Sequence, residues 1–501
     1  MIDTQGGRCF LKVLLVYPEY PDTFLSYKHV VSFVARKASF PPLGLLTVAA
    51  LLPPDWEKRL VDTNTRRLAD EDLAWADMVF VGAMIVQEKS AKAIIARARA
   101  AGKTVVAGGP VFTMQPEHFE GVDHFVLDEA EVTLPAFLAD LERGEAKPMY
   151  TSDVRPDIAR TPIPLWSLIR LKDYVAMCVQ FSRGCPFDCE FCDIVTMNGR
   201  VVRTKSPEQL LAELDALYAA GWRGQLFIVD DNFIGNKVAA KRLLPKLAAW
   251  QKARRYPFIL FTEASMNLAD DEQLMSMMSA ANFSRVFLGI ETTSAESLDE
   301  CGKLQNVGRD LVEAVTTIHA HGMQVMGGFI VGFDNDSEGI FDAQIQFIQH
   351  VGIVVALVVV LSALPKTRLW KRLEAENRLL GDSAGCDTTG HLNFVPRMDR
   401  ELLIAGYQRM LSTLYSREEY YARIHTLLRH YRHTARNRVS LTEVWALVQS
   451  MIRIGLLSRS RFLYWKLIIS TLFTHMRALP VAVELAISGL HFERIAAAAK
   501  A

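Results

Sequence analysis

Three cysteines lie within one short segment, Ser182-Arg-Gly-Cys185-Pro-Phe-Asp-Cys189-Glu-Phe-Cys192. Their spacing is C-x3-C-x2-C, and three thiolates this close on a loop can hold three irons of a cubane [4Fe–4S] cluster. Because such clusters normally take four cysteines, three leave one iron open for another ligand. The motif therefore predicts an iron–sulfur site at which a further ligand can bind.

A structural zinc ion and chance clustering are the alternatives. Structural zinc needs four closed ligands, typically as two separated pairs, and the nearby fourth candidate, Cys178, falls within an expected strand. Chance is disfavoured because three of the seven cysteines lie within eight residues. The other four (Cys9, Cys178, Cys301 and Cys386) are expected to be small buried side chains, and only Cys386, in a Gly/Asp/Thr loop, stands apart.

The cysteines follow the first of six strand-like segments that alternate with amphipathic helices such as 207–220 and 310–321. The strand-like segments are 176–181, 225–229, 258–262, 285–289, 324–331 and 353–361. Six βα units predict a full or partial β/α barrel, whose ligands sit at the carboxyl ends of the strands.

The N-terminal residues show the same alternation in shorter units. Apolar strands are expected at 12–17, 59–62, 77–82, 103–107 and 124–127, with helices at 43–52, at 90–101 and through 141. This pattern predicts a doubly wound, Rossmann-like α/β sheet with ligand loops at 18–20, 82–87, 108–110 and 128–131. We expect domains at 1–147, 176–370 and 371–501, with a proline-containing linker at 148–175 and an all-α C-terminal extension.

Composition excludes several classes of protein. The 501 residues are 50% apolar and 22% charged, with 56 basic and 56 acidic residues, which is ordinary for a globular protein. The absence of a basic excess disfavours nucleic-acid binding, and seven cysteines are too few for a disulfide scaffold. The N-terminus does not read as a signal peptide, and the longest apolar run, 353–364, is too short to span a membrane. We expect a cytoplasmic protein.

The cysteine motif after a first barrel strand resembles that of the radical S-adenosylmethionine (SAM) superfamily, and Phe191 matches the family's usual aromatic residue. The resemblance covers residues 175–370 and implies a [4Fe–4S] cluster on Cys185, Cys189 and Cys192. It also implies that SAM chelates the open iron and is cleaved, with an electron from an external donor, to a 5′-deoxyadenosyl radical. The cofactors supply this chemistry, while the protein places the reactants.

Later strand ends resemble further motifs of this family, including Gly289-Ile-Glu291-Thr and Gly328-Phe-Ile-Val-Gly332. The resemblance, with the usual place of ligands at strand ends, predicts SAM or substrate contacts for Phe191, Asp230, Asp231, Glu263, Glu291, Gly328 and Gly332. Helix capping and turn chemistry are the plainer alternative for the four carboxylates. Lys366 replaces the glycine of a Pro-Gly-Thr motif, so nothing is carried over from that loop.

The segment Phe40-Pro-Pro-Leu-Gly and the loop Gly108-Gly109-Pro110, ahead of such a barrel, resemble cobalamin-binding radical SAM enzymes. This implies cobalamin contacts at Gly82, Ala83, Met84, Gly108, Gly109, Pro110 and Glu129. The sequence has no Asp-x-His-x-x-Gly motif, so a cobalt without a histidine lower ligand is expected. A sheet that binds a nucleotide, or nothing, is the alternative.

The C-terminal part contains Asn393-Phe-Val-Pro396-Arg-Met-Asp399, Gly406-Tyr407 and the segment from Tyr415 to Arg423. These residues resemble the helical extension of a cobalamin-dependent group that includes the hopanoid C-2 methylases. Between 423 and 466, Glu443 is the one acidic residue against nine basic ones: Arg423, Arg429, Arg432, Arg436, Arg438, Arg453, Arg459, Arg461 and Lys466. This charge has three alternative explanations. They are a solvated helical face, a membrane-surface contact beside the apolar segment 462–490, and an acidic substrate or protein partner.

Together these resemblances imply a cobalamin-dependent radical SAM C-methyltransferase that acts on an unactivated carbon of a hydrophobic, lipid-like or tetrapyrrole-like substrate. A radical cyclase, oxidase or rearrangement enzyme without methyl transfer is the first alternative. A non-catalytic cobalamin or redox sensor is the second. The expected partners are a small-molecule substrate and an electron donor, without nucleic acid, and a peripheral contact at the inner membrane face is a further option.

Overall fold

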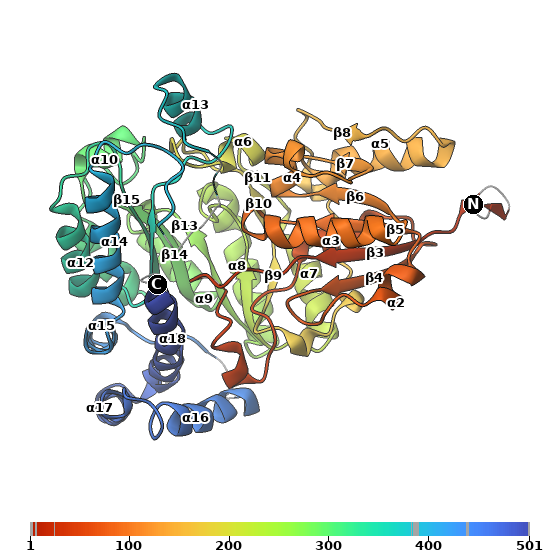
Figure 1. Ribbon diagram of the computed structural model, residues 1–501. Coiled ribbons are helices and arrows are strands. Elements are labelled where there is room, and N and C mark those ends of the chain that lie inside the picture. Colours follow the sequence, from red (N-terminus) through yellow and green to blue (C-terminus); the bar gives the residue numbers. More distant parts are fainter. Residues whose placement is uncertain are drawn as a thin grey trace.

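The computed structural model describes residues 4–5, 8–24, 26–381, 383, 390–436 and 440–498, so Cys386 lies outside the described residues. Within them the chain forms two six-stranded parallel sheets followed by a group of helices (Figure 1). The N-terminal sheet, in red and orange, stands beside the green second sheet. The blue C-terminal helices lie along the second sheet's outer helices and its lower end in this view.

The N-terminal sheet is doubly wound, as predicted, with strand order β4-β3-β5-β6-β7-β8. Its strands are β3 (Lys12–Tyr17), β4 (Glu57–Asp62), β5 (Met78–Gly82), β6 (Thr104–Gly108), β7 (His124–Val126) and β8 (Met149–Tyr150). The strand order reverses between β3 and β5. In open α/β sheets, ligands bind at the carboxyl ends of the strands beside such a reversal.

Helices cover both faces of this sheet because successive strand residues point to opposite sides. Val79 and Val81 pack with Ile94 on one face, and Phe80 packs with Phe137 on the other. The first face carries α2 (Asp70–Trp75), α3 (Glu88–Ala100) and α4 (Pro110–Met114), and the second carries α1 (Leu43–Leu51) and α5 (Ala130–Arg143).

The expectation that the strand at 124–127 is the last of this sheet is wrong, because β8 pairs in parallel with β7. Strand β8 lies within the expected linker and has two residues directly after Pro148, which is too short to show a periodicity. The rest of that segment, up to residue 175, contains the 3-10 helices η4 (Ile158–Arg160), η5 (Trp166–Leu168) and η6 (Leu171–Asp173).

The second sheet is the partial form of the predicted barrel. Its strands follow one another in chain order, and the first and last do not pair, so the sheet is an open half barrel. The strands are β9 (Ala176–Val179), β12 (Gly224–Ile228), β13 (Phe258–Ala264), β14 (Phe283–Glu291), β15 (Gln324–Val331) and β16 (Ala356–Val360). The helices between them are α7 (Pro207–Ala219), α8 (Lys237–Ala253), α9 (Glu272–Ala280), α10 (Ala295–Glu300), α11 (Leu311–Ala320) and α12 (Ile340–Val351).

The cysteine motif forms a closed loop at the end of the first barrel strand. Its two ends pair as short antiparallel strands, β10 (Ser182–Arg183) and β11 (Arg203–Thr204), and α6 (Ile194–Asn198) lies between them. Four other short pieces complete the N-terminal and barrel parts: β1 (Thr4–Gln5) with β2 (Arg8–Cys9), η2 (Ile85–Gln87), η3 (Pro116–His118) and η7 (Met266–Leu268).

The C-terminal extension is all-α, as predicted. Its elements are α13 (Arg368–Ala375), α14 (Arg400–Leu414), α15 (Arg417–His430), α16 (Leu441–Arg453), α17 (Arg461–Thr474), η8 (Met476–Ala478) and α18 (Leu479–Ala498). Helices α14 and α15 pack on α12, while α16 packs on η1 (Val31–Val34). His491 of α18 lies 3.1 Å from the carbonyl oxygens of both Thr23 and Phe24. The C-terminal helix α18 therefore packs on the segment that follows β3.

The basic C-terminal stretch is not one surface. Arg423 is fully buried, with its guanidinium 5.6 Å from the ring of Tyr415 and 5.4 Å from that of Tyr420. Arg438 lies outside the described residues. In the described part of the chain, every helix is too short or too polar to cross a membrane.

Gly352 ends α12 with φ +73, where α15 passes very close. A Cβ atom there would lie 2.6 Å from the backbone nitrogen of Leu427, whereas one at Gly308, with φ +69, would meet nothing within 4 Å. A left-handed alanine costs about 1–2 kcal/mol at either position. We therefore expect Gly352→Ala to lower the thermal unfolding midpoint further than Gly308→Ala. Equal shifts would contradict the close contact of α12 with α15.

Candidate active site

A cavity of about 1370 Å³ lies where the two sheets and the C-terminal helices meet. Its lining comes from the carboxyl edge of the N-terminal sheet, the inside of the half barrel, the segment after β3, and helices α16 and α18. Single pockets for drug-sized ligands usually measure about 300–1,000 Å³. This cavity therefore has room for more than one ligand.

The N-terminal side of the cavity is a bare glycine edge. All seven residues predicted to contact cobalamin line it: Gly82, Ala83, Met84, Gly108, Gly109, Pro110 and Glu129. Gly82 and Gly108 are register partners at the ends of β5 and β6, and a Cβ atom on Gly108 would lie 2.6 Å from the carbonyl oxygen of Val126. Glycine at these strand ends therefore allows β5, β6 and the backbone of β7 to lie close together. The loops that follow form one side of the cavity, where the broad ring of cobalamin would lie. The three histidines before residue 150, His29, His118 and His124, are not among the residues described as lining the cavity.

The three motif cysteines are free thiols on the loop between β10 and α6. Cys189 is buried, whereas Cys185 and Cys192 are half-buried. Burial raises the pKa of Cys189 and of Cys192, and the Lys303 ammonium opposes that rise. In the described residues, no three His, Cys, Asp or Glu side chains converge on one ion position.

The carboxylates of Asp230 and Asp231 hold this cysteine loop. Asp230 accepts hydrogen bonds from the Phe181 N–H at 2.7 Å and from the Ser182 hydroxyl at 2.6 Å. Burial raises the pKa of Asp230 to about 7. Asp231 accepts a hydrogen bond from the Gly184 N–H at 2.9 Å. These carboxylates therefore bond to the loop rather than lining the cavity, which is the turn chemistry considered as the alternative.

Glu291 acts on the cysteine loop through Lys303. The Lys303 ammonium lies 2.6 Å from Glu291 Oε1, and both side chains are almost buried. A Cβ atom on Gly289 would lie 2.3 Å from that oxygen, so the glycine makes room for the pair. Glu291 has φ +66, which is uncommon for a residue other than glycine. The β14 strand has a bulge between Gly289 and Glu291. The bulge directs the Glu291 carboxylate toward Lys303, whose positive charge acts on Cys189.

The remaining predicted SAM residues, other than Glu263, do not line the cavity. The Phe191 ring lies 6.1 Å from the Phe333 ring, centroid to centroid. A Cβ atom on Gly328 would lie 3.1 Å from the Phe287 ring, and the Gly332 N–H donates to Asp336 at 2.8 Å. These residues pack behind the cavity wall.

Glu263, at the end of β13, is different because it lines the cavity. Burial raises its pKa to about 8, with the charges of Asp231 and Asp230 adding to the rise. No cation or hydrogen-bond donor among the described residues lowers this pKa. At neutral pH the carboxyl group is therefore protonated, and it can donate a hydrogen bond to a ligand in the cavity.

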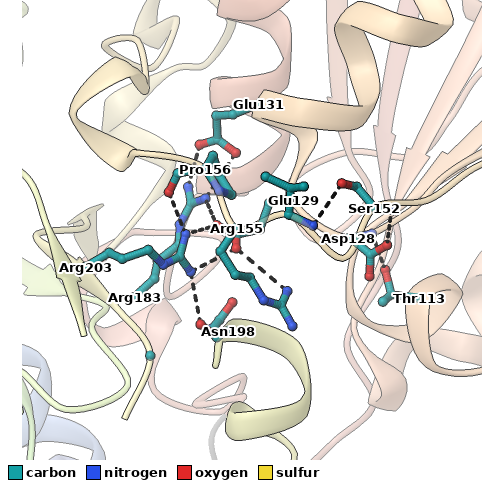
Figure 2. Close-up of polar contacts among 12 residues, drawn as sticks. Thr113, Asp128, Glu129, Glu131, Ser152, Arg155, Pro156, Arg183, Asn198 and Arg203 are labelled. Carbon is teal, nitrogen blue, oxygen red and sulfur yellow. Dashed lines mark hydrogen bonds and ion pairs between the residues drawn. The ribbon is translucent and has the colours of Figure 1, made fainter. Parts of the chain in front are cut away.

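Sequence reasoning missed a buried ion-pair cluster that joins the two sheets (Figure 2). Arg183 lies 2.7 Å from Glu129 and 2.8 Å from Glu131, and Arg203 lies 2.8 Å from Glu129. Burial by itself would raise the pKa of Glu131, but the Arg183 guanidinium brings it below its ordinary value. Glu129 therefore lines the cavity with its carboxylate already paired, and its main contacts are arginines on either side of the cysteine loop.

Lys366 makes a second link between the sheets. Its φ of +64 is a left-handed backbone conformation, which glycine adopts more easily than other residues. The Lys366 ammonium donates to the carbonyl oxygen of Thr113 at 2.8 Å. Thr113 belongs to α4, directly after the glycine edge.

Helix α13 contacts the cysteine motif from the other side. Arg372 lies 2.7 Å from Glu190 and 2.8 Å from Asp334, and Arg368 lies 2.9 Å from Asp188. The partners lie 180 and 182 positions apart in the sequence, so local spacing gave no signal of this contact.

The cysteine loop at the end of the first half-barrel strand contributes Arg183, Met197 and Asn198, but none of its three cysteines, to the lining of the cavity that the glycine edge of the doubly wound sheet also lines. This arrangement is the one expected of a radical SAM enzyme with a corrinoid-binding domain. Family models agree with this assignment. The radical SAM superfamily matches residues 179–348, the B12 binding domain matches residues 31–138, and a domain of unknown function, DUF4070, matches residues 367–501.

Comparison with known proteins shows to which group of radical SAM enzymes the chain is similar. The chain is 43% identical to an uncharacterized methyltransferase of Synechocystis, over 91% of this chain and 86% of that protein. It is 37% identical to the hopanoid C-2 methylase of Rhodopseudomonas palustris, over 75% and 73% of the two chains. The radical SAM methyltransferase TsrM of Kitasatospora setae, solved with cobalamin and a [4Fe–4S] cluster, shares the fold with a TM-score of 0.64 at 15% identity, over 89% and 99% of the chains.

The chain belongs to the cobalamin-dependent radical SAM methyltransferase family. Its cofactors are accordingly a [4Fe–4S] cluster, SAM and cobalamin.

Removal of Arg183 tests the ion-pair cluster. Arg183→Met leaves Glu131 buried without its arginine, and breaking a buried pair costs about 3–5 kcal/mol. We expect a lower thermal unfolding midpoint and less iron bound after cluster reconstitution. Arg409→Met is the matched control, because its pair with Asp342 is exposed and lies away from the cysteine loop, and such a pair is worth at most about 1 kcal/mol. Equal losses in the two variants would show that the buried cluster is not needed.

The carboxyl group of Glu263 predicts a pH dependence. Its pKa in the folded chain, about 8, lies above the ordinary value of 4.5. The folded state therefore binds the proton more tightly, and stability falls as the pH rises from about 4.5 to about 8. Glu263→Gln removes this penalty, so its thermal midpoint should exceed that of the wild type above pH 8 and match it near pH 4.5. A constant difference across this range would contradict the assignment.

Proposed function

We propose that this enzyme methylates an unactivated carbon of a large, mostly apolar molecule, such as a polycyclic lipid or a tetrapyrrole. The observation that carries the proposal is the apolar wall of the cavity. On the barrel side, Phe227 and Phe261 are stacked 4.8 Å apart with their rings almost parallel, and Phe40 lies 5.6 Å from Phe227. On the helical side, the lining includes Leu447, Leu485, Ile487 and Phe492.

The similarity to the hopanoid C-2 methylase supports a polycyclic lipid in particular. Flat aromatic side chains pack well against a rigid ring system, because apolar area is removed from water without a loss of ligand flexibility. Arg285 is partly neutralised by Glu484 of α18 and lies 5.0 Å from the Phe261 ring. Arg183 and Lys205, which also line the barrel side of the cavity, are paired with Glu131 and Glu213, so these charges are largely balanced within the protein.

We assign the cluster to Cys185, Cys189 and Cys192, and the cobalamin to the loops at 82–84 and 108–110. When bound, these cofactors supply a radical derived from SAM and a transferable methyl group. The chain positions them: the Arg183 cluster fixes the cysteine loop against the cobalamin edge, and Lys303 adds positive charge beside the thiolates. Glu263 lies between these regions and offers a hydrogen bond to a polar group of SAM or substrate.

Two further partners follow from this function. The cluster requires an external electron donor. A polycyclic lipid resides in membranes, so we propose that the enzyme works peripherally at the cytoplasmic face of one.

The test uses anaerobically purified full-length protein with reconstituted cluster, cobalamin, SAM, a strong reductant and a host lipid and pigment extract. Methyl transfer by radical chemistry uses one SAM as methyl donor and one as radical source. We therefore expect near-equal, extract-dependent amounts of S-adenosylhomocysteine and 5′-deoxyadenosine over many turnovers. 5′-Deoxyadenosine alone would favour a cyclase, oxidase or rearrangement enzyme.

Alanine variants control for the cluster. Cys185→Ala, Cys189→Ala or Cys192→Ala should each abolish 5′-deoxyadenosine formation. Cys301→Ala removes another buried thiol of the same domain and should keep it. A motif variant with full activity and full iron content would overturn the cysteine assignment.

A further inference from the structure

Helices α16 and α17 carry an exposed apolar face that has no role in the proposed catalytic chemistry. Twelve large apolar side chains between residues 444 and 476 are exposed, among them Leu457 at 77%, Phe462 at 75% and Phe473 at 82%. The complete α16–α17 face comprises Val444, Trp445, Val448, Met451, Ile452, Leu456, Leu457, Phe462, Ile469, Leu472, Phe473 and Met476. Scattered exposed apolar residues are normal, but a gathered patch marks an interaction surface. Figure 1 shows both helices at the lower end of the molecule, with α18 above them.

The exposed charges in this segment are all positive. Five basic side chains are exposed (Arg453, Arg459, Arg461, Lys466 and Arg477), and the sequence from 444 to 477 contains no acidic residue. Lys466 lies on the same side of α17 as Phe462, Ile469 and Phe473, because residues spaced by three or four share a helix face. In the described part of the chain, none of the five forms an ion pair. The α16–α17 face therefore combines apolar and cationic side chains.

We propose that the α16–α17 face lies on an anionic lipid surface. Helices α16 and α17 have 13 and 14 residues, whereas a membrane-spanning helix needs about 20. Short helices with apolar and basic side chains lie in the plane of a membrane interface, where apolar groups enter the lipid and basic groups meet anionic headgroups. The cytoplasmic leaflet carries such negative charge.

The face is continuous with the cavity. Val444 is 47% exposed and also lines the cavity. Further along α16, Ala446 and Leu447 line it as well, and Val481 of α18 adds to this apolar side. A molecule dissolved in the lipid can therefore reach the cavity along apolar side chains. This part of the inference rests on the proposed function, since it supplies a reason for a lipid-dissolved substrate.

A second copy of the chain is a less suitable occupant. A two-fold interface places the same patch of both subunits in contact. Here it would bring ten basic side chains together, five from each copy, without an acidic residue from the same segment to pair with them. Anionic lipid satisfies both the apolar and the charged side chains.

The test is flotation of the full-length protein with vesicles, in the absence of SAM, reductant and substrate. One set of vesicles is phosphatidylcholine alone, and the other also contains phosphatidylglycerol. We expect binding to the anionic vesicles that weakens as salt is added. Phe462→Ser with Phe473→Ser should reduce this binding at least tenfold, because two large apolar side chains are removed from the interface.

Two further variants separate the contributions. Val154→Ser with Val238→Ser removes apolar side chains of comparable exposure elsewhere and should leave binding unchanged. Arg461→Gln with Lys466→Gln should weaken binding to anionic vesicles by about fivefold per residue and leave binding to phosphatidylcholine unaffected. Unchanged flotation of the Phe462/Phe473 variant would overturn the proposal. So would a wild-type oligomer in light scattering that this variant converts to a monomer.

This experiment is independent of catalysis. Vesicle binding without methylation of any lipid would contradict the proposed substrate class and support the proposed membrane-binding surface. Methylation of a detergent-dissolved lipid by a protein that does not bind vesicles would support the proposed substrate class and contradict the proposed membrane-binding surface.

Discussion

The pairing of Glu129 and Glu131 with Arg183 and Arg203 sets the position of everything else in the cavity. Buried ion pairs contribute little net stability, because desolvation offsets their attraction, but an arrangement that breaks them leaves carboxylates buried without a partner. The two sheets therefore have one favourable orientation, in which the glycine edge faces the end of the barrel. The Lys366 contact to Thr113 restricts the same orientation from the loop after β16, at the opposite edge of the half barrel. Two cofactors that must react with each other need this constraint more than they need extra stability.

Much of the fold was predictable because its strands are buried on both faces. Such strands are continuous apolar runs, and they account for most of the predicted strands. The edge strand β4 begins with Glu-Lys-Arg and is partly exposed, and it was expected only from residue 59. The cysteine spacing pointed to the cluster on chemical grounds, and the glycine loops pointed to the open edge of the sheet. The part that failed was β8, since two residues cannot show a pattern.

The roles of individual charged residues were not predictable in the same way. The Arg183 pairs join residues about 50 positions apart, and Glu291 meets Lys303 only because a bulge turns the chain at that point. Local spacing cannot tell a carboxylate that holds a loop, such as Asp230, from one that faces a ligand, such as Glu263. Composition likewise cannot tell an exposed basic residue from a buried one. Arg423 belongs to the basic stretch in the sequence, but its side chain is buried beside the rings of Tyr415 and Tyr420.

The cavity wall joins the two ends of the fold. His491 of α18 contacts backbone carbonyls of residues 23 and 24, more than 460 positions earlier. Proteins fold from the N-terminus as they leave the ribosome, so both sheets can form while α18 has yet to be synthesised. The part of the cavity wall that α18 supplies, which includes Leu485, Ile487 and Phe492, is therefore the last to be completed.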